Sequence, residues 1–259
     1  MAIRGLEIFT QHFAAHQDQY VMIGGVAAWL TMDEAGASFR ATKDLDIVLV
    51  MEALDKRFVA HFWDFIKAGG YQIQQGDGER PVFFRFQRPA DETYPVQLEL
   101  FTRTPDRFEL PEDARLTPIP MDGSVSSLSA FLLDDAYYAF LLEGRQLIGD
   151  ITHIGADRLI PFKAKAWLNL SEDKAKGRPV DRKNILKHRN DVLSLSTLLS
   201  EQPIELPARI RKDMVHFIER LGHEEVNLKD LKLKGSLAII IERLTKSFGL
   251  HVIEARQSL

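Results

Sequence analysis

The sequence predicts an α+β protein, with a mixed β-sheet flanked by helices over residues 1–122 and a helical bundle over residues 123–259. In the first part, short apolar runs are separated by turns rich in glycine and proline, which is typical of strands. Beyond residue 122, apolar residues recur at the three- and four-residue spacing of amphipathic helices. At 259 residues the chain could form one large domain or two modest ones, and the change of pattern favours two.

The composition excludes several classes of site and of protein. No cysteine is present, so disulfides, thiol nucleophiles and zinc–thiolate sites are excluded. The first residues lack the long apolar core of a signal peptide, and no stretch is long enough to span a membrane. We therefore expect a cytoplasmic protein of ordinary globular composition.

The first elements follow from apolar spacing. Residues 3–15 have the period of a helix that packs on the back of the sheet, and the apolar run Tyr20–Ile23 predicts a strand. Gly24 and Gly25 come next, and a short helix continues through residues 26–32. Small and polar residues at 33–38 predict a mobile loop.

Two carboxylates occupy the next strand. Because strand side chains alternate, Asp44 and Asp46 point to one face while Leu45 and Ile47 point to the other. Like charges this close repel unless a cation lies between them, and Mg²⁺ prefers a few carboxylate oxygens together with water or phosphate oxygens. The strand therefore predicts a magnesium site, although it could also be a core strand with a solvated acidic end.

The glycine pair predicts a phosphate site next to these acids. Gly24 and Gly25 allow the backbone to approach a phosphate closely, and the following helix offers its N-terminal N–H groups. One segment thus combines a phosphate cradle with carboxylates for a metal.

The remaining elements of the first part are a helix and four strands. The helix covers 52–68 and stops at Gly69-Gly70, and alternation or apolar runs predict the strands. A hairpin-like turn at residues 76–81 joins the first two of them, and proline restricts the last to an edge. The strands are 71–75, 82–87, 94–102 and 116–120.

The second part reads as helices throughout. Their predicted ranges are 126–143, 157–169, 181–199, 205–221 and 228–247. Net charge is −4, which argues against a broad nucleic-acid footprint, but basic residues gather between Lys163 and Arg189. That run is either a solvated helical hairpin or a local seat for RNA.

The order of Gly24-Gly25, one helix, and then Arg40, Thr42, Asp44 and Asp46 resembles the first motif of the DNA polymerase β-type nucleotidyltransferase superfamily. Within it, the chain resembles most the AbiE-type (AbiEii-like) toxins of abortive-infection systems, from Gly24 and, more weakly, to about residue 195. The resemblance implies a nucleotidyltransferase-fold sheet followed by a helical domain that contributes a lysine and an aspartate to the active-site cleft.

The resemblance also implies roles for individual residues. Asp44, Asp46 and Glu99 would hold two Mg²⁺ ions, with Glu99 also accepting a proton from the attacking hydroxyl. Glu99 stands where the superfamily commonly has aspartate, so its longer side chain could instead be structural. The other implied residues are Gly24, Gly25, Arg40 and Thr42 around the nucleotide, Lys163 or else Lys165 at its phosphates, and Asp191 at the nucleotide or the lysine.

The function implied is transfer of a nucleotide from an NTP to an RNA (tRNA) or protein hydroxyl, as the toxin of a toxin–antitoxin pair with a cognate antitoxin. Two alternatives stay open. One is a catalytically silent nucleotide-binding or antitoxin module with this fold. The other is an enzyme that modifies a small molecule, as aminoglycoside nucleotidyltransferases do.

Overall fold

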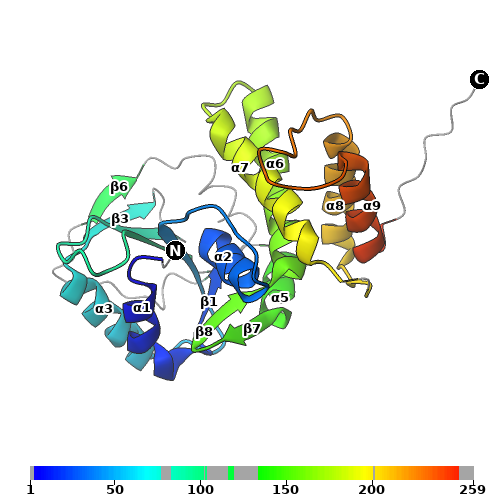
Figure 1. The fold of residues 1–259 in the computed structure, drawn as a ribbon. Coiled ribbons are helices and arrows are strands. Elements are labelled where there is room, and N and C mark those ends of the chain that lie inside the picture. Colours follow the sequence, from blue (N-terminus) through cyan, green and yellow to red (C-terminus); the bar gives the residue numbers. More distant parts are fainter. Residues whose placement is uncertain are drawn as a thin grey trace, which may run out of the picture. The chain divides into compact units, whose positions relative to one another are not determined.

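The computed structural model describes residues 3–76, 83–101, 103, 116–119, 134–200 and 202–250. The chain divides into two compact units, Met1–Gly155 and Ala156–Leu259 (Figure 1). Unit 1 contains the sheet, and the described elements of unit 2 are helices. The predicted mixed sheet flanked by helices is therefore present.

Within the described residues, the sheet of unit 1 has eight strands in the order β6-β3-β4-β5-β2-β1-β8-β7. Its central strand β2 pairs antiparallel with β1 and parallel with β5, so the sheet is mixed. β6 lies at one edge, as its proline predicts. The strands are β1 Tyr20–Ile23, β2 Asp44–Leu49, β3 Gln72–Gly76, β4 Phe83–Gln87, β5 Gln97–Phe101, β6 Leu116–Ile119, β7 Arg145–Ile148 and β8 Ile151–Ile154.

Helices α1 (Leu6–His12) and α3 (Lys56–Gly69) cover one face of this sheet (Figure 1). Their aromatic side chains pack on one another and on the strands: Phe9 lies edge-on to Tyr20 of β1, and Phe62 lies edge-on to Phe86 of β4. Because strand side chains alternate, Arg85, the neighbour of Phe86, points to the opposite face. The aromatic core thus fixes which side chains remain on that other face.

Helix α3 begins and ends where its sequence provides caps. The Asp55 side chain accepts a hydrogen bond from the N–H of Phe58 at 2.8 Å, and Gly70 ends the helix in the left-handed region at φ 62°. The helix is shorter at its start than the predicted range 52–68. Helix α1 is also shorter than predicted, and a 3₁₀ turn, Ala14–His16, follows it.

The division between the units differs from the sequence prediction, which placed it at residue 122, outside the described residues. Three elements beyond that point stay with the sheet: α5 (Asp135–Glu143), β7 and β8. The hairpin of β7 and β8, which the sequence reading missed, extends the sheet because β8 pairs in parallel with β1. The first eight residues of the predicted helix 126–143 lie outside the described residues.

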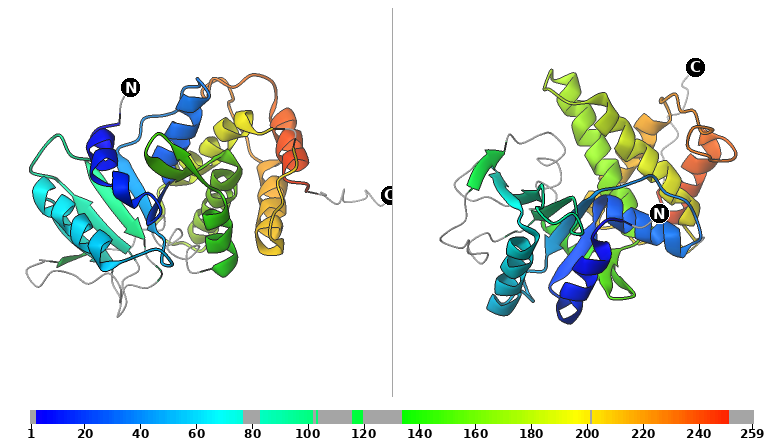
Figure 2. Two further views of the ribbon diagram at one scale, coloured as in Figure 1. Left: turned by 90° about the horizontal axis from the view of Figure 1, so that it is seen from below. Right: turned by 60° about the vertical axis from the view of Figure 1, so that its left-hand side comes forward.

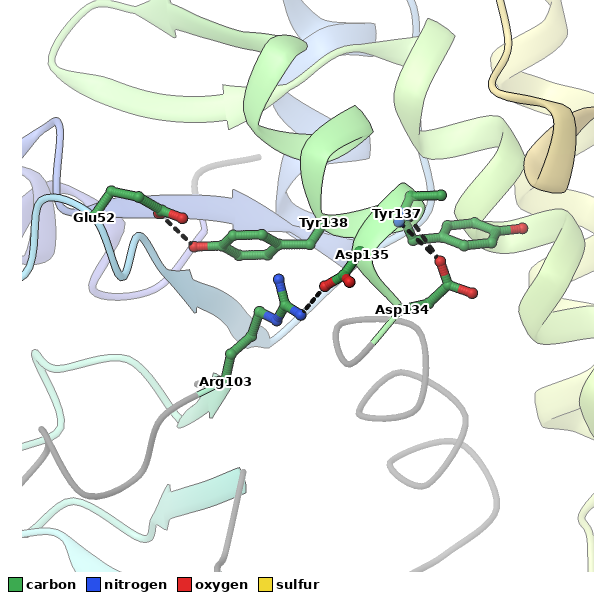
Figure 3. A network of polar contacts seen from close by, with 7 residues as sticks. Glu52, Arg103, Asp134, Asp135, Tyr137 and Tyr138 are labelled. Carbon is green, nitrogen blue, oxygen red and sulfur yellow. Dashed lines mark hydrogen bonds and ion pairs between the residues drawn. The ribbon is translucent and has the colours of Figure 1, made fainter.

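Polar contacts tie α5 to the ends of two strands (Figure 3). The Tyr138 hydroxyl donates to the carboxylate of Glu52, just beyond β2, at 2.9 Å. Arg103, just beyond β5, forms an ion pair with Asp135, and its guanidinium lies over the Tyr138 ring, 4.6 Å from the ring centre. Burial raises the pKa of the Tyr138 hydroxyl to about 12, so it remains a donor at neutral pH. This network explains why α5 belongs to unit 1.

In unit 2, α6 packs along α7 and α8, and α8 contacts α9; α6 and α7 lie side by side in both figures of the whole chain (Figure 2). The helices are α6 Ala156–Ala175, α7 Arg182–Leu195, α8 Ala208–Leu221 and α9 Leu237–Ser247. Asp181 caps α7 by accepting a hydrogen bond from the N–H of Lys183. Among the described helices, none combines the length and apolar character needed to cross a membrane.

Candidate active site on the sheet of unit 1

Three charged side chains form a row across neighbouring strands. The strand register sets Arg85 of β4 opposite Glu99 of β5, and Glu99 opposite Asp46 of β2. One step along the strands, Gln97 lies opposite Asp44. All these side chains share the face away from the aromatic helices, because Leu45 and Leu98 between them are buried on the other side.

The carboxylate of Asp46 lies directly against the glycine pair. Helix α2 (Gly24–Glu34) begins immediately after β1, and the N–H of Gly25 donates to Asp46 Oδ2 at 3.4 Å. Gly24 adopts φ +67°, and a Cβ there would lie 1.7 Å from Asp46 Oδ2. Glycine is required here both for the left-handed backbone and for the space that Asp46 occupies.

The segment before β2 returns to the same place. A Cβ on Gly25 would lie 2.4 Å from Thr42 Oγ1 and 3.6 Å from Arg40 Nη2. The structure therefore brings Gly24, Gly25, Arg40, Thr42 and Asp46 together at the start of α2. A helix N-terminus with backbone N–H groups and a nearby guanidinium favours an anion such as a phosphate.

Glu99 is held in an unusual electrostatic state. Burial and the adjacent negative charge of Asp46 raise the pKa of the Glu99 carboxyl to about 8, and the guanidinium of Arg85 only partly opposes that shift. Two carboxylates this close on paired strands resist being ionised together. A hydrogen bond between Asp46 and Glu99 contributes to the same shift.

The donor set of this site fits a magnesium ion bound together with phosphates. No group of three or more histidine, cysteine, aspartate or glutamate side chains is arranged to hold a metal ion within the described ranges. The three predicted carboxylates thus do not form a ready cage. Mg²⁺ usually takes one or two carboxylates and completes its shell with water and substrate phosphates, and the adjacent oxygens of Asp46 and Glu99 beside the glycine pair fit that pattern.

The predicted lysines and Asp191 lie in unit 2. Lys163 of α6 forms an ion pair with Asp191 of α7 at 2.7 Å, and only 6% and 2% of the two side chains are exposed. Lys165 pairs instead with Asp213 of α8 at 2.8 Å. The two lysines point to different helices, as their spacing of about 200° around α6 requires. Their roles toward a nucleotide stay predictions.

Sequence reasoning missed Arg85 and Gln97, which both contact Glu99. Arg85 donates to Glu99 Oε1 through Nε at 3.0 Å and lies 2.8 Å away through Nη2, and Gln97 Nε2 donates to the same oxygen at 2.8 Å. A signal existed in the sequence: Arg85 interrupts the aromatic run Phe83–Phe86, and Gln97 lies two residues before Glu99 on the same strand face.

No family model and no curated protein sequence matches this chain. Among solved structures, it is similar to an antigenic nucleotidyltransferase-like protein from Paracoccidioides brasiliensis, with 14% sequence identity and a TM-score of 0.47. The alignment covers 94% of this chain and 91% of that one. A likeness this distant assigns neither family nor activity.

Proposed function

We propose that the chain is a magnesium-dependent nucleotidyltransferase that transfers a nucleotide from an NTP to a hydroxyl group. The observation that carries the proposal is the adjacency of Asp46 and Glu99 on paired strands, with Asp46 against the Gly24-Gly25 turn at the start of α2. The carboxylates that could bind a metal thus lie next to the backbone N–H groups that could bind a phosphate, because Asp46 contacts the glycine pair.

The reaction asks mainly for positioning and charge neutralisation. The acceptor oxygen bonds to the α-phosphorus, the bond to pyrophosphate breaks, and Glu99 takes the proton of the hydroxyl. Bound Mg²⁺, held by Asp44 and Asp46 with Glu99 beside them, would neutralise charge on the phosphates. The N–H groups of Gly24 and Gly25 and the Arg40 guanidinium would bind the triphosphate.

Glu99 is placed for its part in this scheme by the strand register, which sets it opposite Asp46. A general base must lie within hydrogen-bond reach of the proton that it takes, so the hydroxyl would have to bind beside this pair of carboxylates.

The test is transfer of label from α-³²P-NTPs to total RNA or to cell lysate in the presence of Mg²⁺. Asp44→Ala and Asp46→Ala should abolish labelling while leaving the fold intact. The matched control is Asp33→Ala, because Asp33 is an exposed acid near the end of α2 in the same unit. Equal labelling by wild type and Asp46→Ala would sink the proposal.

For the acceptor we propose RNA, with tRNA as the first candidate, and a protein hydroxyl as the alternative outcome. Support comes from exposed basic side chains around the α6–α7 connection, namely Lys174, Arg182, Lys183 and Lys187. Part of the basic run is neutralised locally, since Arg178 pairs with Asp173 and Arg189 with Glu224. Label that ribonuclease removes, and binding that falls steeply with salt, would support RNA.

A role as the toxin of a toxin–antitoxin pair belongs to the same proposal. It rests on the resemblance of the motif from Gly24 to Asp46. Expression of the wild-type chain should then arrest growth of a bacterial host, whereas expression of Asp46→Ala should not. Growth arrest by both forms would remove the toxin role and leave the enzymatic proposal in place.

One observation favours a second candidate, a silent nucleotide-binding module. Glu99 Oε1 already accepts from Arg85 and Gln97, so part of the metal-binding capacity of the site is occupied. A silent module would bind labelled NTP in equilibrium dialysis but transfer nothing to any acceptor. An active enzyme would do both.

A further inference from the structure

Two side chains, Arg85 and Gln97, donate hydrogen bonds to one oxygen of Glu99. Arg85 Nε and Nη2 lie 3.0 and 2.8 Å from Oε1, and Gln97 Nε2 lies 2.8 Å from it. Each side chain is placed by the strand on which it stands: Arg85 is directly opposite Glu99, and Gln97 is two residues before it. The convergence is thus built into the sheet register.

This arrangement makes the two oxygens of Glu99 unequal. A carboxylate oxygen offers about two lone-pair sites, so Oε1 has both sites filled when it accepts from Arg85 and Gln97. Oε2 is then the oxygen left for other partners, and Asp46 lies directly opposite Glu99 on β2. The side chain is largely buried, with 13% exposed, which further limits its rotation.

We propose that Arg85 and Gln97 are positioning residues that clamp Glu99 through Oε1 and thereby present Oε2, beside Asp46, to the metal and the reacting hydroxyl. This inference rests on the proposed function and deepens it. Neither residue touches the reacting atoms. They act through Glu99, in the way that outer hydrogen bonds orient metal ligands in other proteins.

A competing role for Arg85 is charge compensation alone. In that case any cation at residue 85 would serve, and Gln97 would be dispensable because it carries no charge. In a clamp, the planar fork of arginine matters and lysine is a poor substitute, since it offers a point charge without paired donors. Arg85→Lys and Gln97→Ala therefore separate the two roles without removing a cation.

The experiment is a titration of the full-length protein with Mn²⁺ alone, followed by the electron paramagnetic resonance signal of the free ion. Mn²⁺ takes the same oxygen ligands as Mg²⁺. Gln97→Ala and Arg85→Lys should each weaken Mn²⁺ binding about 10-fold, the lower end of the range seen when outer hydrogen bonds to metal ligands are removed.

The matched control is Gln87→Ala. Gln87 lies opposite Gln97 in the strand register and has the same side chain, but it stands on β4 and is diagonal to Glu99, whereas Gln97 is on the same strand as Glu99. It should bind Mn²⁺ as wild type does. Thermal unfolding without metal checks that Gln97→Ala retains its fold, and a purely structural role of Gln97 would lower the melting temperature while leaving the Mn²⁺ affinity unchanged.

The outcomes separate this inference from the proposed function. If wild type binds Mn²⁺, Asp46→Asn does not, and both Gln97→Ala and Arg85→Lys bind as wild type, the clamp is wrong and the metal site stands. If Asp46→Asn binds Mn²⁺ as wild type does, the proposed metal site itself fails. Weakened binding in Gln97→Ala and Arg85→Lys, with Gln87→Ala unchanged, supports the clamp.

Discussion

Gly24 carries the tightest steric constraint at the candidate site. Its φ of +67° favours glycine, and a Cβ would lie 1.7 Å from the Asp46 carboxylate. Gly36 has the same φ of +67°, but a Cβ there would meet nothing within 4 Å. The two positions therefore separate backbone strain from collision with the site.

We expect Gly36→Ala to lower the free energy of unfolding by about 1 kcal/mol, the cost of a left-handed non-glycine residue. Gly24→Ala should lower it by about 1–3 kcal/mol more, because the methyl group displaces Asp46. Urea unfolding of both variants measures the difference. Equal losses would mean that Asp46 moves aside at no cost.

Glu99 makes stability depend on pH. Its carboxyl pKa is raised from 4.5 to about 8 in the fold, so the folded state holds a proton that the unfolded state releases. This contribution to stability is fully present below pH 4.5 and is lost as pH rises toward 8. The free energy of unfolding should fall by up to about 1.4 kcal/mol per pH unit in that window.

In Glu99→Gln, which keeps an oxygen acceptor for Arg85 and Gln97, that slope should largely vanish. Urea unfolding between pH 5 and 9 with EDTA present measures it. Magnesium with NTP should flatten the wild-type slope in the same way, by displacing the proton. Parallel curves for wild type and Glu99→Gln would contradict the raised pKa.

At the scale of elements, α6 and α7 are joined by a buried ion pair. Lys163 and Asp191 are almost completely removed from solvent, whereas Lys176 and Glu172 of the same hairpin form a pair with 63% and 47% of their side chains exposed. A buried charge that loses its partner is costly, and an exposed pair contributes little.

Asp191→Leu should lower the free energy of unfolding by about 3–5 kcal/mol, because Lys163 is left charged and buried. The double variant Lys163→Met/Asp191→Leu should recover most of that loss. Glu172→Leu, the exposed counterpart, should change stability by less than about 1 kcal/mol. Failure of the double variant to recover would show that the pair makes further contacts that apolar side chains do not replace.

At the scale of the whole molecule, the boundary between the units decides which fragments fold. A chain ending at residue 155 keeps β8, which pairs with β1 beside the site strand. A chain ending at residue 122 would lose β7 and β8 and leave β1 as an open edge. We expect the 1–155 fragment to unfold cooperatively in urea and the 1–122 fragment to aggregate or lack a transition.

Much of unit 1 could be predicted from local patterns. The strand of Asp44 and Asp46 and the glycine turn before it follow from alternation and turn residues. The place of Glu99 beside these acids was expected only from the resemblance of the motif, and the structure sets Asp46 and Glu99 side by side. Local pattern failed for the hairpin of β7 and β8. Strand β7 is largely exposed and β8 is buried throughout, so neither alternates. Their place depends on a partner, β1, that is distant in sequence.

The contacts of Arg85 failed for a related reason. An arginine within an aromatic strand indicates that an acidic partner is present, but the sequence does not identify that partner. The register with β5 is set by packing over the whole sheet. For Lys163 and Lys165, the sequence could predict only that the two do not share a partner. Helical spacing shows that the two cannot share a target, and only the packing of α7 and α8 identifies Asp191 and Asp213 as their partners.

The alternation of apolar and acidic residues in β2 also fixes its register in the sheet. A register shift of one residue would turn Asp44 and Asp46 into the hydrophobic core beneath α1 and α3. It would also turn Leu45 and Ile47, which are both fully buried, to the opposite face. The cost of burying the two carboxylates and of exposing the two apolar side chains thus disfavours this misalignment, and no contact with a ligand is needed. In any correctly folded chain the two carboxylates therefore lie on the face opposite α1 and α3.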